Sequence, residues 1–135
     1  MIMLRNQPAD PAPTASQSLV MMGVGITFTP ARSGFALVNI AGVARTNTAT
    51  VGLTAGGRFG TGAPPVNGAA VTGMPFAADQ VLRAASAVTG GTGFCLCDIV
   101  GLTPGTAYWF DIALLTATAA DTAQVQNISA VIFEF

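Results

Sequence analysis

Histidine and lysine are both absent from the 135-residue chain, and glutamate occurs once, at Glu134. Charged residues make up 8% of the chain, and the formal net charge is −1. In ordinary soluble proteins, roughly a quarter of all residues are charged. A chain without lysine has no basic patch to neutralise phosphates, so nucleic acid is not an expected partner. The shortage of acids, bases and metal ligands argues against most enzyme chemistry.

Long apolar runs are missing as well. A membrane-spanning helix needs about 18 consecutive apolar residues, and no such stretch occurs, so no membrane partner is expected. Apolar residues nevertheless make up 51% of the chain, which is too many for a disordered protein. An apolar chain with so few charges must hide surface, and the usual place is a contact between subunits. The composition therefore predicts a single domain that forms an obligate oligomer.

Cysteine occurs only twice, at Cys95 and Cys97. Two cysteines are too few for a disulfide scaffold and, without histidine, for a zinc shell. At positions i and i+2 of a strand they also lie too far apart for an easy disulfide. We predict two free thiols that are buried as small apolar groups, with no metal and no cofactor. The order of residues at the N-terminus does not fit an export signal, so synthesis in a cytoplasm is expected.

Residues 1–18 predict an extended N-terminal arm, because prolines spaced along this segment can neither continue a helix nor pair fully in a sheet. The remaining residues, 19–135, are predicted to form one β domain that folds without the arm. We expect the arm to dock on a larger assembly or on a neighbouring subunit. The candidate docking residues are Met1, Ile2, Met3, Leu4, Pro8, Pro11 and Pro13.

From residue 19 onward, short apolar runs alternate with glycine, proline, asparagine and threonine, and no helical period is sustained. A long exposed loop is predicted over residues 60–68, where glycines and paired prolines cluster. Strands at this spacing indicate an all-β protein, either a β-sandwich or a jelly roll. The predicted strands are 19–28, 34–45, 50–59, 80–88, 93–100, 106–116 and 124–135.

Two of these strands, 34–45 and 124–135, carry apolar residues on both faces. One face fills the sandwich, and the other needs a neighbouring subunit to cover it. The predicted contacts between subunits are Val38, Ile40, Ile128 and Ile132.

Asp98 and Asp111 fall on neighbouring predicted strands. They are candidates for a carboxylate pair of the kind that hydrolases use, or each is a partner of an arginine. No other acid, base or electrophile gathers near either position, so a structural role is favoured over a hydrolase.

The most specific stretch is Leu102–Asp111. Pro104-Gly105 suits a type II turn, and the hydroxyl of Tyr108 is placed to bond back to that turn. Fibronectin type III domains use a similar Leu-x-Pro-Gly-x-x-Tyr turn. An alternative function is therefore a fibronectin-like or lectin-like binding module for adhesion or carbohydrate, which requires Tyr108 and Trp109 to be exposed.

The strand 35–45, the loop Phe59-Gly60-Thr61-Gly62-Ala63-Pro64-Pro65 and the segment Leu102–Asp111 together resemble tailed-bacteriophage virion proteins of the small trimeric jelly-roll type. The resemblance covers about residues 19–135. It implies a tumour-necrosis-factor-like jelly roll that forms a homotrimer. It also implies a non-enzymatic role in capsid decoration (cement) or as a head fibre, with the major capsid protein or another virion protein as partner. The expected location is the virion, after synthesis in the host bacterial cytoplasm.

Overall fold

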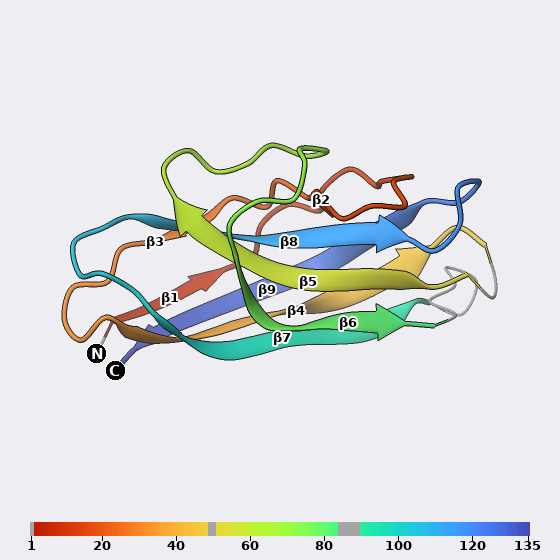
Figure 1. Cartoon of the computed structure of the whole chain (residues 1–135). Helices are drawn as coiled ribbons and strands as arrows, with labels where there is room; N and C mark the ends of the chain where they lie inside the picture. Colours follow the sequence, from red (N-terminus) through yellow and green to blue (C-terminus); the bar gives the residue numbers. More distant parts are fainter. Residues whose placement is uncertain (1, 49–50, 84–89) are drawn as a thin grey trace.

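The computed structural model describes residues 2–48, 51–83 and 90–135, and they form nine β-strands in two antiparallel sheets (Figure 1). Sheet A has the order β1 (Ile2–Asn6), β9 (Ala123–Glu134), β4 (Phe35–Thr46) and β7 (Thr92–Gly101). Sheet B has the order β2 (Val20–Met21), β8 (Tyr108–Thr116), β5 (Leu53–Thr61) and β6 (Met74–Leu82), and β3 (Ile26–Phe28) also pairs with β8. The predicted all-β class is confirmed. Among these residues, no helix is long and apolar enough to cross a membrane.

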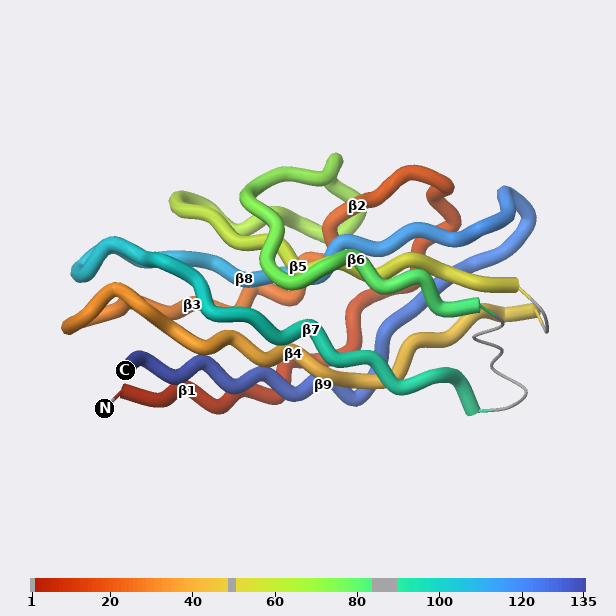
Figure 2. The backbone as a smooth tube through the Cα atoms, turned by 60° about the horizontal axis from the view of Figure 1, so that its bottom comes forward, coloured from red at the N-terminus to blue at the C-terminus, as the bar shows by residue number. Residues whose placement is uncertain are grey.

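The connections give the sandwich a jelly-roll topology. The chain passes from β4 to β5, from β6 to β7 and from β8 to β9, each time from one sheet to the other. The first strand, β1, lies beside the last, β9, so the two chain ends meet at one end of the molecule (Figures 1 and 2). Paired strands that cross between two antiparallel sheets are the jelly-roll arrangement, as predicted.

The core lies between the two sheets, because alternate residues of each strand point inward. Phe110 of β8 is fully buried and stacks on Phe59 of β5, with ring centroids 5.7 Å apart. Phe76 of β6 meets the edge of the same Phe110 ring at 6.0 Å. These aromatic contacts join three neighbouring strands of sheet B across the interior.

Five predicted strands match β4, β5, β7, β8 and β9 to within a few residues, although position 50 lies outside the described residues. The predicted strand 80–88 is displaced, because β6 begins at Met74 and ends at Leu82, and positions 84–88 lie outside the described residues. The predicted strand 19–28 is divided into β2 and β3. Gly23 and Gly25 between them have φ angles of +71° and +65°, which lie outside the extended β region and interrupt the regular strand.

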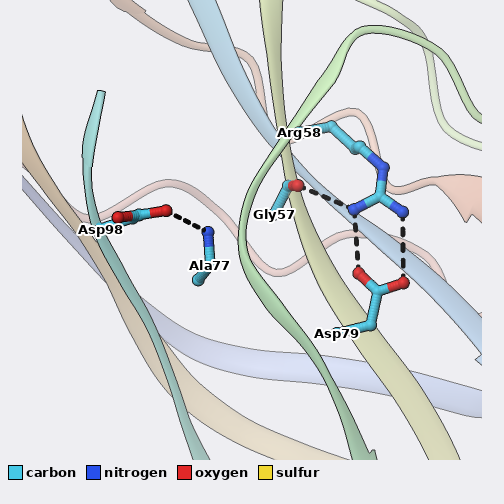
Figure 3. A network of polar contacts seen from close by, with 5 residues as sticks. All are labelled: Gly57, Arg58, Ala77, Asp79 and Asp98. Atoms are coloured by element: carbon cyan, nitrogen blue, oxygen red, sulfur yellow. Dashed lines mark hydrogen bonds and ion pairs between the residues drawn. The ribbon is translucent and has the colours of Figure 1, made fainter. Parts of the chain in front are cut away.

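Strand β6 is tied to both sheets by side chains (Figure 3). Arg58 of β5 pairs with Asp79 of β6 through two bonds of 3.0 and 3.4 Å. Asp98 of β7 accepts a hydrogen bond of 3.0 Å from the backbone N–H of Ala77, which has a φ of +58°. The side chain of Gln80 donates to the carbonyl of Cys95 at 2.7 Å. These bonds occupy backbone groups at adjacent sheet edges, which lowers the tendency of those edges to pair with another strand.

Glu134, at the end of β9, fixes the C-terminal part of the chain to the turn before β4. Its buried carboxylate accepts backbone hydrogen bonds from Ala31, Arg32 and Gly34 at 2.9, 2.7 and 3.3 Å. Because these bonds favour the charged form, they hold the pKa of Glu134 below its ordinary value of 4.5. The ionised side chain therefore stabilises the folded state.

We expect Glu134→Gln to be less stable than the wild type at pH 7, by an amount that shrinks on acidification. The wild type keeps the contribution of the carboxylate above about pH 4.5 and loses it as the pH falls through the lower folded-state pKa. The variant lacks this contribution at every pH. Urea unfolding of both proteins at pH 7 and pH 3 measures the difference, and an equal difference at both pH values contradicts the prediction.

Candidate assembly surfaces

The four residues predicted to contact another subunit lie inside a single chain. Val38, Ile40 and Ile132 are 0% exposed and Ile128 is 2% exposed, and all four belong to the core between the sheets. The prediction of these residues as an interface is therefore wrong. Both faces of β4 and β9 are apolar, so the sequence does not distinguish the inward face from the outward face. The four residues predicted as subunit contacts belong to the inward face.

The outward face of sheet A carries the other apolar set. The register places Met3, Phe133, Leu37 and Ile99 in one row across β1, β9, β4 and β7. Met3, Leu37 and Ile99 are 50%, 36% and 57% exposed. Phe35 and Phe135 continue the patch toward the chain ends, at 56% and 55% exposed. Large apolar side chains are thus gathered on one face instead of being scattered singly.

The same face is nearly free of charge. Among the described residues, the outward positions of its four strands hold no carboxylate, and their charged residues are Arg5 and Arg45. Beside the apolar row lies a shallow hollow of about 420 Å³, lined by Arg5, Asn6, Gln7, Ser129 and Val131. The face therefore combines an apolar patch with a polar surround of amides, a hydroxyl and two arginines.

The outward face of sheet B, in contrast, is covered by the chain itself. A second, smaller core forms there from Met21, Trp109 and Ala113, with Leu19 and Ala69 packed against it. Figure 1 shows the segment before β3 and the loop between β5 and β6 above this sheet. That loop covers 62–73, since the first two positions of the predicted loop 60–68 belong to β5.

This cover contradicts one requirement of the binding-module alternative, an exposed Trp109. Trp109 is only 4% exposed, and its Nε1 donates to the carbonyl of Thr61 at 3.2 Å. Tyr108 is half-buried, and its hydroxyl accepts the backbone N–H of Thr103 at 3.0 Å. The predicted tyrosine corner is confirmed, including a positive φ of +80° at Gly105. Both aromatic side chains serve the fold, and neither is presented to a ligand.

Asp111 also lies beneath the cover of sheet B. Its carboxylate is fully buried and accepts backbone hydrogen bonds from Gly23, Val24 and Ile112 at 2.9, 3.0 and 2.7 Å. Desolvation raises the pKa of Asp111, and these three bonds oppose part of the increase. The carboxylate therefore holds the segment between β2 and β3 in place.

Asp98 lies in the other sheet and bonds to β6, so it does not meet Asp111. The predicted position of the two carboxylates on neighbouring strands is wrong, and the pair that a hydrolase requires does not form. Neither pairs with an arginine, since the ion pair found among the described residues is Arg58–Asp79. Across those residues, no three histidine, cysteine, aspartate or glutamate side chains gather as a metal site would require.

Cys95 and Cys97 are free thiols on the outward face of sheet A. Both are exposed, so the prediction of burial is wrong. Phe94 and Leu96 take the inward positions of β7, and the strand alternation turns the cysteines outward.

The first part of the predicted arm is a strand of the jelly roll. Ile2–Asn6 forms β1 and pairs with β9 over five residues. Ile2 and Leu4 pack against the main core, while Met3 points outward, and position 1 lies outside the described residues. The apolar run Ile2-Met3-Leu4, which precedes the first proline by several residues, was the signal for a strand that the sequence interpretation missed.

Residues 7–18 extend from sheet A across to the outside of sheet B. The carboxylate of Asp10 accepts the backbone N–H of Asn127 at 2.8 Å, and Thr14 exchanges two backbone bonds of 2.8 Å with Ala123. The side chain of Asn67 donates to the carbonyl of Ala12 at 3.0 Å. Of the prolines, Pro8 and Pro11 are half-buried and Pro13 is exposed. These hydrogen bonds therefore hold this segment extended while many of its side chains face solvent.

The comparisons with known proteins concern the fold. No protein-family model and no curated protein matches the chain. A chain in the solved structure of infectious bursal disease virus, Gx strain, matches with a TM-score of 0.51 and 18% sequence identity. The match covers 97% of this chain and 31% of the viral chain. This protein therefore spans about a third of the length of the viral chain. The corresponding structure of the Gt strain matches over the same shares with a TM-score of 0.49 and 16% identity.

Proposed function

We propose that the chain is a non-enzymatic structural protein of a virus particle, of the decoration (cement) or head-fibre kind found in tailed bacteriophages. It acts as a homotrimer bound to the major capsid protein or another virion protein. The observation that carries the proposal is the match of 97% of this chain to part of a chain in a virus structure. The function is association alone and uses no cofactor.

The acidic side chains support this proposal, because they form hydrogen bonds or ion pairs within the same chain. Asp98, Asp111 and Glu134 accept hydrogen bonds from backbone N–H groups of the same chain. Asp79 pairs with Arg58. Groups committed to such bonds stabilise loops and strand edges, which is what a protein that works by holding a fixed shape requires.

The segment 7–18 is the proposed attachment site. Its backbone is already held extended by bonds to Asn67, Ala123 and Asn127, so a partner does not have to order it. Among the docking candidates, Met3 and Pro13 face solvent, whereas Ile2 and Leu4 anchor β1 to the core. Three such segments on one trimer multiply weak contacts into firm attachment.

A substitution test leaves the strand β1 intact. The exposed residues Ala9, Ala12 and Ala15 contribute no side-chain bonds, so replacing all three with glutamate preserves the fold. We expect this triple variant to bind at least about tenfold more weakly to shells assembled from the major capsid protein of the virus that encodes this chain. Three added charges in an attachment site cost more than the 1.4 kcal/mol that a tenfold change represents. Cosedimentation of chain and shells measures the binding.

The matched control replaces Ala63, Ala78 and Ala107 with glutamate, which adds the same charge at exposed positions that make no hydrogen bond to the segment. This variant is expected to bind like the wild type. Equal binding by the segment variant and the wild type contradicts the proposed attachment site. A wild-type chain that does not sediment with the shells contradicts the proposed function.

A further inference from the structure

We infer that copies of this chain associate through the outward face of sheet A, centred on the row of Met3, Phe133, Leu37 and Ile99. The inference deepens the proposed function and rests on it for the expectation of a trimer. The partner is a second copy of the chain, and the surface is opposite to the one that the sequence indicated on β4 and β9.

The first argument is the contrast between the two outward sheet faces. On sheet B, the chain covers its own apolar residues, and Trp109 and Ala113 are almost completely buried beneath Met21 and Ala69. On sheet A, no other described segment performs this role, and Leu37, at the centre of the row, is 36% exposed. Figure 2 shows the four strands of this sheet side by side. One face is thus completed within the chain and the other is left open.

The second argument is the size of the face. Four strands spaced about 4.8 Å apart give a width of about 19 Å, and ten residues at about 3.3 Å each give a length of about 33 Å. The projected area is about 600 Å², before the relief of the side chains is counted. Each partner in a standard interface contributes about 800 Å². The face therefore supplies most of the area that a standard contact with one further copy of the chain requires.

The third argument concerns what kind of surface fits. The outward positions in the described part of sheet A lack carboxylates, and the thiols of Cys95 and Cys97 and the amide of Asn39 accompany the apolar row. The charged residues beside the row, Arg5 and Arg45, offer no complement to a basic partner, whereas the row itself complements another apolar face. An apolar patch this continuous promotes aggregation unless its cover is present in equal amount, and copies of the same chain always meet that condition.

The test measures the mass of the purified protein by sedimentation equilibrium. We expect the wild type to have a mass three times the 13.6 kDa of one chain, and Leu37→Asp to have the mass of one chain while keeping the wild-type circular dichroism. The control is Val66→Asp, which places the same charge on an apolar residue that is 72% exposed in the loop over sheet B. Val66→Asp is expected to remain associated.

A second readout uses the natural thiols and needs no variant. On the outward face of β7, Cys95 and Cys97 lie within the inferred contact, so in the native wild type they should react with a thiol reagent more slowly as the protein concentration rises. In Leu37→Asp, both should react at the rate of an exposed thiol. Should the aspartate variant not fold, Leu37→Gln and the concentration dependence of thiol reactivity in the wild type decide the question.

Several results overturn the inference. They are a monomeric wild type, a folded Leu37→Asp that stays associated, dissociation by Val66→Asp, and thiol reactivity that does not depend on concentration. The proposed function fails separately, because an associated protein that does not bind capsid shells rejects the virion role while leaving this interface intact. Shell binding by a monomeric wild type rejects the interface while leaving the virion role intact.

Discussion

Val38→Asp is expected to unfold the protein, with a loss of about 4 kcal/mol or more in the free energy of unfolding. Val38 is 0% exposed and lies in the core between the sheets. The substitution removes the apolar contacts of Val38 and places a carboxylate in an apolar core that supplies no cation or hydrogen-bond donor for it. A loss of this size is a large fraction of the 5–15 kcal/mol that stabilises a typical domain.

The neighbouring residue provides the matched control. Leu37→Asp introduces the same side chain one position earlier, where the strand alternation points it out of the sandwich. We expect a change of less than about 1 kcal/mol in the stability of one chain. Urea unfolding followed by far-UV circular dichroism compares the two variants. A stable, folded Val38→Asp that merely dissociates would restore the inward set of residues as the contact between subunits.

Asp111→Ala is expected to cost about 3 kcal/mol of stability. The change removes the acceptor for the backbone N–H groups of Gly23, Val24 and Ile112 in a fully buried place. A buried donor left without a partner costs about 1–3 kcal/mol. Removal of the buried charge offsets part of the total. Urea unfolding at pH 7 measures the loss, and hydrogen exchange at Gly23 and Val24 should increase.

Two further variants make this prediction specific. Asp98→Asn alters an exposed carboxylate that also accepts a backbone bond, and it should change stability by less than about 1 kcal/mol. In Asp111→Asn the charge is absent at every pH. Because burial raises the pKa of Asp111 above 3.8, the wild type loses stability relative to this variant as the pH rises through that region. A loss in Asp111→Ala no greater than that in Asp98→Asn contradicts the assigned role.

The sequence alone was enough for the fold class and for most of the strands. Short apolar runs divided by glycine and proline correspond to β4, β5, β7, β8 and β9, and Pro104-Gly105 with Tyr108 gave the corner in detail. These features are local, because a turn or an alternation is specified by residues close together in the chain. The same local logic, applied to the prolines, concealed β1 within a supposed arm.

Only the tertiary structure decided which face of each strand is buried and which residues meet. β4 and β9 are apolar on both sides, so nothing in their own residues selects Val38 over Leu37 for the interior. The selection depends on the sheet that packs opposite, which is built from residues distant in sequence. For the same reason, Asp98 and Asp111 proved to lie in different sheets, and Trp109 proved to be covered by segments far from it in the chain.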